Sequence, residues 1–213
     1  NNCIRPPTER ETQLLLDRIS AVNPLLVGFG FGSPYFKLVR DLTARLRSVT
    51  KAPALWGGIH ATTCPEDCIG HADFVCVGEG EYATLELCQA LVQKADTGHI
   101  PGLWARQGAE ILSNPVRPLL ENLDSLPFPD YLQANTAFIE DNRLDETDPI
   151  SQTVEYRIYP TRGCPYRCAY CYNSTLRELY KNHGRYYRIR GVDSIVGELQ
   201  HARRLFPNTR RVK

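Results

Sequence analysis

The stretch ADFVCVGEGEYATLELCQALVQKA, residues 72–95, decides how the first half of the chain folds. Its opening, residues 72–78, is a short apolar run without polar alternation, which is typical of a strand buried on both faces. The glycines that follow permit a tight turn, and residues 82–95 carry apolar side chains at helical spacing. Strand, turn and helix in this order form the repeating unit of an α/β fold.

A second unit of this kind lies near the start of the chain. The apolar run of residues 25–31 predicts a strand, and residues 33–49 predict a helix with Ser33 as its N-cap and Pro34 as its first residue. A further helix is expected over residues 8–24, because leucine and isoleucine recur there at helical spacing before a proline ends the pattern.

Between these units, residues 52–56 predict another strand, which is followed by a loop over residues 57–67. Repeated strand–helix units with nearly continuous apolar strands predict a parallel sheet that is covered on both faces. Ligands of such sheets bind outside the carboxyl ends of the strands. The two glycine loops that follow strands, at 57–58 and 78–80, therefore mark a candidate binding site.

The middle of the chain connects two αβ regions. Residues 102–114 predict a β-hairpin that turns near Gly108. Residues 115–131 carry four prolines and predict an ordered strap, and the acidic residues 133–150 predict an irregular surface linker.

A second αβ pattern follows the linker. Residues 153–161 predict a strand, residues 191–206 an amphipathic helix, and residues 210–213 the start of the next strand. This is the opening unit of an α/β barrel or an open sheet. The expected division is a Rossmann-like domain over 1–112, a linker over 113–152 and the first part of a second domain over 153–213.

Composition excludes several classes of function. The 213 residues carry a formal net charge of +1 and no apolar run long enough to cross a membrane. Charge therefore gives no argument for nucleic acid or an anionic membrane surface as a partner. Of the eight cysteines, Cys76 and Cys88 sit within apolar patterns, which favours a reduced, cytoplasmic chain over a disulfide scaffold. Because the chain has no methionine, we interpret it as an internal fragment.

Three cysteines lie close together at Cys164, Cys168 and Cys171, with the spacing C-x3-C-x2-C. Thiolates bind zinc or iron well, and close spacing lets one loop supply several of them. A structural zinc prefers four ligands, and the nearest fourth in sequence is His183. Three thiolates instead suit a 4Fe–4S cluster with one open iron. Arg162, before the loop, and Arg167, within it, are candidates to offset the negative charge of such a cluster.

With Tyr170 before the third cysteine, this loop resembles the cluster motif of the radical S-adenosylmethionine (radical SAM) family. The resemblance implies that the open iron chelates the amino and carboxylate groups of SAM and that Tyr170 lies beside the adenine. It also implies reductive cleavage of SAM to a 5′-deoxyadenosyl radical, and a partial TIM-like barrel as the fold of this region.

Residues 10–95 resemble the cobalamin-binding domain that precedes the barrel in one radical SAM class. The resemblance implies a Rossmann-like, flavodoxin-like parallel sheet, whose first two strands precede residue 1, with strand-end loops that cradle the corrin ring. The residues at matching positions are Ser33, Gly57, Gly58, His60, Thr62, Gly78, Glu79 and Gly80. His60 either contacts the cofactor or hydrogen-bonds the loop. The sequence does not identify which residue is the lower ligand of cobalt.

Two further patterns concern a second metal and a dinucleotide. Cys64 and Cys68 form a second C-x3-C beside His60 and His71, so a second metal site stays open. The glycines of VGFGFGS, residues 27–33, lack the G-x-G-x-x-G spacing of a dinucleotide site, which disfavours NAD.

Together the resemblances imply an enzyme that uses a 4Fe–4S cluster, SAM and cobalamin, with methyl transfer to an unactivated centre as the expected reaction. Its expected partners are a small-molecule substrate and an electron donor such as flavodoxin or ferredoxin, without nucleic acid. We expect residues 1–213 alone to be inactive. Two alternatives are a radical SAM enzyme of another reaction type whose first domain does not bind cobalamin, and a non-enzymatic zinc-binding module.

Overall fold

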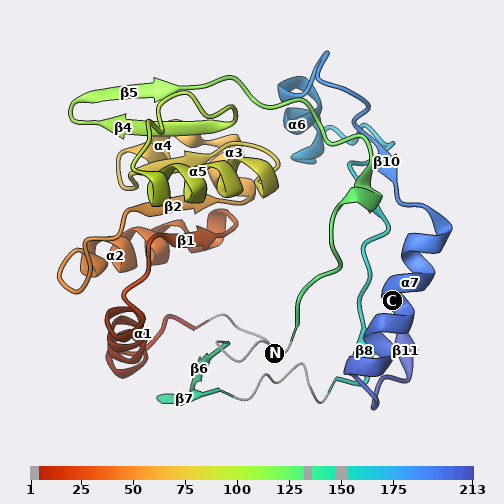
Figure 1. The fold of residues 1–213 in the computed structure, drawn as a ribbon, viewed down its shortest axis with the longest axis horizontal. Coiled ribbons are helices and arrows are strands. Elements are labelled where there is room, and N and C mark those ends of the chain that lie inside the picture. Colours follow the sequence, from red (N-terminus) through yellow and green to blue (C-terminus); the bar gives the residue numbers. More distant parts are fainter. Residues whose placement is uncertain (1–4, 132–135, 147–152) are drawn as a thin grey trace.

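The computed structural model describes residues 5–131, 136–146 and 153–213. Residues 5–113 form a sheet domain, and residues 153–213 form a smaller cysteine unit, which stands to one side of the sheet (Figure 1). The strap of residues 115–131 runs between the two. No helix in the described ranges is both long enough and apolar enough to cross a membrane.

The sheet domain contains five strands in the order β1-β2-β3-β4-β5. The first three, β1 (Val27–Gly30), β2 (Ala54–Gly57) and β3 (Phe74–Cys76), are parallel. The hairpin of β4 (Leu103–Gln107) and β5 (Glu110–Ser113) continues the sheet in antiparallel pairing. The predicted Rossmann-like sheet and the predicted hairpin are thereby confirmed.

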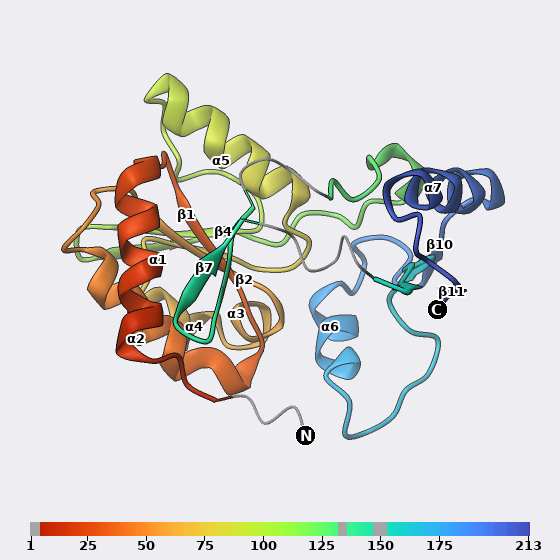
Figure 2. The ribbon, with the colours of Figure 1, turned by 90° about the horizontal axis from the view of Figure 1, so that it is seen from below.

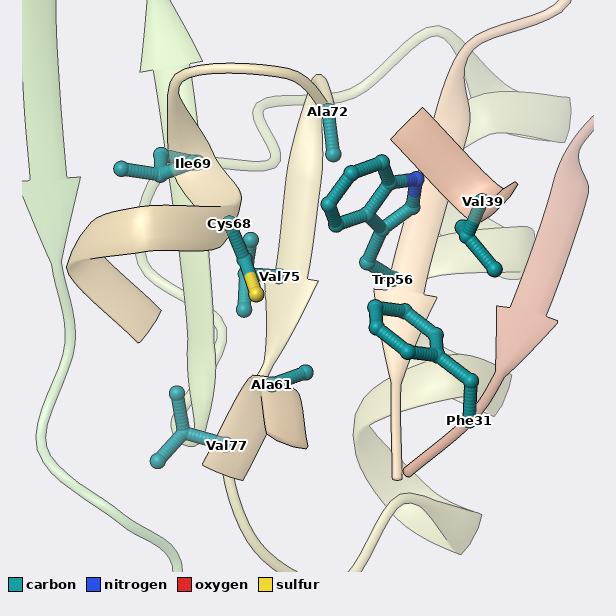
Figure 3. Packing of buried hydrophobic residues seen from close by; sticks show 9 residues of the cluster. All are labelled: Phe31, Val39, Trp56, Ala61, Cys68, Ile69, Ala72, Val75 and Val77. Atoms are coloured by element: carbon teal, nitrogen blue, oxygen red, sulfur yellow. The ribbon is translucent and has the colours of Figure 1, made fainter. Parts of the chain in front are cut away.

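Helices cover both faces of this sheet, as the apolar strands predicted. On one face, α2 (Phe36–Leu46), α3 (Ile59–Thr63) and α4 (Pro65–Ile69) pack over Trp56 and Val75. Figure 3 shows this cluster, in which Trp56 lies between Val39 and Val75. On the other face, α5 (Glu81–Gln93) packs over Leu55, Phe74 and Cys76.

The first helix, α1 (Glu9–Val22), begins and ends as its sequence predicts. Thr8 and Glu11 form a reciprocal capping box, and Asn23 closes the helix in the left-handed conformation before Pro24. Leu16 packs against Val27 of β1 and Leu46 of α2, so α1 covers the β1 end of the sheet domain (Figure 2).

Two local predictions in this domain were wrong. Ser33 is not an N-cap: it lies inside a 3₁₀ turn, η1 (Ser33–Tyr35), and its hydroxyl bonds to His60 instead of to a helix N–H. The segment 57–67 is not a loop, because it forms α3 and α4. In α3, threonine hydroxyls donate to carbonyls four residues earlier, as that of Thr63 does to the carbonyl of Ile59.

The acidic segment is also more regular than predicted, since β6 (Phe138–Glu140) and β7 (Arg143–Asp145) form a hairpin. The hairpin packs against α1, where the amide of Asn142 donates to Glu11 Oε1 at 3.2 Å. Polar contacts with a distant helix therefore order a stretch whose own pattern showed no periodicity. Residues 133–135 and 147–150 of the predicted linker lie outside the described residues.

In the cysteine unit, β8 (Glu155–Tyr156) pairs in parallel with β11 (Arg211–Val212), and α7 (Val192–Leu205) crosses between them. Tyr156, Ala202 and Phe206 form the core of this βαβ unit. The predicted helix and the predicted final strand are confirmed. They form the first αβ unit that the barrel resemblance implied.

The predicted continuous strand over 153–161 was wrong. A separate strand, β9 (Thr161–Arg162), follows Pro160, which has no N–H to donate to a ladder. This strand pairs in antiparallel fashion with β10 (Arg188–Ile189). Between them lie the cysteine loop and α6 (Asn173–Leu179), a helix that the sequence pattern does not predict. In the strap, η2 (Leu123–Ser125) buries Leu123.

Candidate functional site

The candidate site begins at the carboxyl ends of β2 and β3, where the two glycine loops lie. Gly58 has φ +91°, and a Cβ there would lie 2.7 Å from the backbone N and O of Phe31. The amide of Phe31 donates to the carbonyl of Gly57 at 3.1 Å. Only glycine permits this approach of the two strand ends, so the backbone stays exposed to a ligand at this edge.

Thr62 connects the two glycine loops. Its hydroxyl donates to the carbonyl of Gly58 at 2.8 Å and accepts from the amide of Gly78 at 3.1 Å. Thr62 is buried, and it sits one turn into α3. The loops of β2 and β3 thus form one connected edge, as expected if both take part in one site.

His60 lies beneath this edge. Its Nδ1 and the hydroxyl of Ser33 are 3.0 Å apart, and its ring packs against Phe31 and Phe36 with centroids 5.8 and 4.9 Å away. The ring of His60 therefore hydrogen-bonds the turn that follows β1 and not its own segment. His60 Nε2 is buried and has no hydrogen-bond partner among the described residues.

Glu79 points away from this edge and toward the cysteine unit. Arg188 donates to its two carboxylate oxygens at 2.6 and 3.0 Å, and Arg162 lies 3.3 Å away. The strap contributes the amide of Leu120, at 3.2 Å. Burial favours the neutral acid, but these hydrogen bonds and charges outweigh it and lower the pKa of Glu79. Gly80 has φ −95° and begins α5, so it needs no special conformation.

The cysteine loop leaves β9 through Gly163, which has φ +77°. A Cβ at this position would lie 2.9 Å from the carbonyl carbon of Tyr186, so the sharp exit requires glycine. Arg177 donates to the carbonyls of Cys164 and Tyr166, the second at 3.3 Å, and its guanidinium lies 4.8 Å from the ring centroid of Tyr186. An α6 side chain thereby holds the first half of the loop.

The second half of the loop is held by Asn173. Its Nδ2 donates to Cys171 Sγ at 3.4 Å, and the hydroxyl of Tyr186 fixes the amide by donating to its Oδ1 at 2.6 Å. Backbone and side-chain hydrogen bonds from Asn173 lower the pKa of Cys171, which favours the thiolate that metals bind. Tyr170 is 94% exposed, so its ring is free to stack on a ligand.

The described part of the chain contains no group of three His, Cys, Asp or Glu side chains that converge as a metal site. Cys164, Cys168 and Cys171 lie on one accessible loop, so their chemistry fits an iron–sulfur cluster, although their sulfur atoms are not gathered. Within the described residues, Cys64 and Cys68 do not converge with a third such side chain either. Burial raises the pKa of Cys68 to about 12, which makes it a poor metal ligand.

A cavity of about 390 Å³ separates the glycine loops from the cysteine unit. The hydroxyl of Tyr180 accepts from the amide of Glu79 at 2.7 Å and lies directly over Gly78. Both units line the cavity, the sheet domain with Gly58, Ile59, Thr62, Gly78 and Glu79, and the cysteine unit with Arg162, Gly163, Tyr172, Asn173, Leu176, Tyr180, Tyr186 and Arg188.

Sequence reasoning missed most of the residues on the far wall of this cavity. Arg162 was expected to offset a cluster, but it pairs with Glu79 and Glu81. Tyr180, Tyr186 and Arg188 follow the cysteine motif within a stretch that showed no clear period. The abundance of tyrosine and arginine in this stretch is the one sequence feature that indicates a contact surface.

The glycine edge suits a large planar ligand, because Gly58 is exposed and Gly57 is half-buried at the carboxyl end of β2. Residues 6–88 match the family model described as the B12 binding domain. This part of the chain is a B12 binding domain. Cobalamin is therefore the cofactor that this family implies for the glycine edge.

Curated relatives include an uncharacterized methyltransferase of Pyrococcus horikoshii, 30% identical over 150 residues, which are 67% of this chain and 28% of the relative. The hopanoid C-3 methylase of Methylococcus capsulatus is 28% identical over 149 residues, which are 68% of this chain and 25% of the methylase. The chain thus spans about a quarter of the length of the relatives it matches.

Solved structures share the fold. The radical S-adenosylmethionine methyltransferase TsrM from Kitasatospora setae gives a TM-score of 0.64 at 22% identity, covering 89% of this chain and 36% of TsrM. The cobalamin-dependent S-adenosylmethionine radical enzyme OxsB gives 0.67 at 17% identity, covering 94% and 26%. The resemblance to the cobalamin-binding radical SAM family is confirmed in the B12 binding domain and in the fold.

Proposed function

We propose that this chain belongs to an enzyme that combines cobalamin with SAM bound at a 4Fe–4S cluster and transfers a methyl group to an unactivated centre. The observation that carries this proposal is the cavity of about 390 Å³, which the B12 binding domain and the cysteine unit line together. When bound, these cofactors supply hydrogen-atom abstraction and a methyl group, and the protein positions them.

The residues divide into two sets by position. Cys164, Cys168 and Cys171 would hold the cluster, and the exposed ring of Tyr170 would lie against the adenine of SAM. The backbone of the glycine loops would cradle the corrin, with Thr62 and Ser33 holding those loops in place. Glu79 joins neither set, because its carboxylate is already occupied by Arg188.

Two partners follow from this chemistry. A small-molecule substrate would enter the shared cavity, whose volume lies in the range of about 300–1,000 Å³ that is usual for ligand pockets. A flavodoxin or ferredoxin would supply the electron that reduces the cluster. The cysteine loop is accessible to such a donor, because Cys168 and Tyr170 are exposed.

The test is to purify the full-length protein without oxygen and to measure iron, sulfide and corrin absorbance per chain. We expect about four irons and four sulfides, the composition of one 4Fe–4S cluster, together with bound cobalamin. SAM should be cleaved after reduction, and a methylated product should form only when cobalamin is supplied.

A Cys171→Ala variant should lose iron and SAM cleavage but keep cobalamin, whereas Cys88→Ala, a cysteine of α5 outside the loop, should keep all three. Turnover without cobalamin would instead favour a radical SAM enzyme of another reaction type. Zinc without iron or sulfide would favour the zinc-binding module.

A further inference from the structure

The cysteine loop is closed at its base by β9 and β10, and each of these strands presents one arginine. Arg162 and Arg188 are directly opposite each other in the antiparallel register. Arg162 immediately precedes Gly163 and the first cysteine, and Arg188 lies where the chain returns after α6. Both arginines form ion pairs with the same carboxylate, that of Glu79.

Glu79 belongs to the other unit, in the turn between β3 and α5 of the B12 binding domain. Arg188 binds it through both carboxylate oxygens, and the side chain of Arg188 is only 4% exposed. Charge-assisted, two-point pairing of this kind fixes orientation as well as distance. A single carboxylate therefore holds both strands at the base of the cysteine loop.

Further contacts converge on the same turn. Arg188 also donates to the carbonyl of Leu120 at 2.8 Å, and the amide of Leu120 donates to Glu79 at 3.2 Å. The amide of Glu79 itself donates to Tyr180, the residue after α6, at 2.7 Å. The strap, the helix after the cysteines and the base of their loop all meet at this one residue.

We propose that Glu79 is a positioning residue that sets the cysteine loop against the B12 binding domain. Its carboxylate fixes the base of the loop, so the separation between the cysteine-bound group and the glycine edge depends on it. The consequence for catalysis rests on the proposed function, but the positioning itself does not. The residue acts on the cysteine loop through Arg188 and Arg162.

The first test is amide hydrogen exchange on the full-length protein, with and without cofactors. In a Glu79→Gln variant the side chain keeps its shape and loses its charge. Peptides that cover residues 119–120 and 183–190 should then exchange about tenfold faster, because charge-assisted hydrogen bonds are lost. The matched control is Glu86→Gln, which removes a carboxylate of α5 that pairs with Arg117 and not with the cysteine unit. The proposal is overturned if the two variants exchange at equal rates in these peptides.

An Arg188→Lys variant gives an independent check, because lysine keeps the charge but cannot make the forked contact with Glu79 and Leu120. It should accelerate exchange in the same peptides. Combined with Glu79→Gln, it should add little, because both changes break one interaction. Fully additive effects would show that the two residues act separately and would also overturn the proposal.

In the loaded enzyme, Glu79→Gln should keep its cobalamin and iron content and its KM for SAM, while kcat falls about 100-fold, the loss typical of a misplacement near 1 Å. An unchanged kcat in an active enzyme would refute the positioning role. If the wild-type protein binds neither cobalamin nor a cluster, the proposed function is refuted. The hydrogen-exchange experiment then still tests whether Glu79 positions the cysteine loop.

Discussion

Gly78 of the B12 binding domain lies directly beneath Tyr180 of the cysteine unit, and a single methyl group there should separate the two. Its φ of +95° is a conformation that side chains rarely adopt. A Cβ on Gly78 would overlap the hydroxyl of Tyr180 and lie 2.9 Å from its Cζ. Gly78→Ala must therefore strain the backbone and also displace the phenol.

The magnitude has two parts. An alanine held at this φ costs about 1–3 kcal/mol of folding free energy. Displacing Tyr180 also breaks its hydrogen bond with the amide of Glu79, which contributes about 1 kcal/mol. We expect Gly78→Ala to lower the free energy of unfolding by about 2–4 kcal/mol.

Urea unfolding monitored by the fluorescence of Trp56 and Trp104, the two tryptophans of the chain, measures this change. The control is Gly70→Ala, because Gly70 has φ −63° and open space around its Cα. That variant should be neutral or stabilised by about 0.5 kcal/mol. In a Tyr180→Ala background, Gly78→Ala should cost about 1 kcal/mol less, because the overlap is gone. Equal effects of Gly78→Ala and Gly70→Ala on stability would refute the reasoning.

Three further outcomes follow from buried groups. Thr43→Val should lower the free energy of unfolding by about 1–3 kcal/mol in the same urea assay. The buried indole N–H of Trp56 donates to Thr43 Oγ1 at 2.9 Å, and it would lose this acceptor. An unchanged urea midpoint would contradict this prediction. Burial raises the pKa of Tyr180 from 10.0 to about 12, so its contribution to stability is complete below pH 10 and is lost as pH rises through 12. Denaturation midpoints measured across that range, with Tyr180→Phe as control, test the sign. Buried Cys68 should react with iodoacetamide at pH 8 far more slowly than exposed Cys168, as measured by mass spectrometry, and equal rates would contradict its burial.

The sequence by itself determined the elements of the first domain. Apolar runs such as residues 72–78, followed by a glycine turn and a helical pattern, are typical of central strands. The signals around α1, from Thr8 to Pro24, act within a few residues of one another. The cysteine spacing and the glycine loops carried the resemblance to cobalamin-binding radical SAM proteins. These features are local, so they can be read without knowing what they pack against.

In other segments the tertiary structure decided which hydrogen bonds form, because the partner residues lie far away in the sequence. Ser33 has the chemistry of an N-cap, yet it bonds to His60 because the end of β2 brings that ring beside it. The hairpin β6–β7 forms on α1, more than a hundred residues earlier in the chain. No periodicity in either segment could have shown these contacts.

Glu79 illustrates the division most clearly. The resemblance placed it in a cobalamin loop, and the structure does place it in the glycine turn between β3 and α5. Its partners, Tyr180 and Arg188, lie 101 and 109 positions further along the chain. A carboxylate in a turn binds whichever cations the fold brings to it, so its role depends on how the second unit returns to the first. That arrangement comes from the packing of the strap, α6 and the β9–β10 pair, and not from any property of the turn itself.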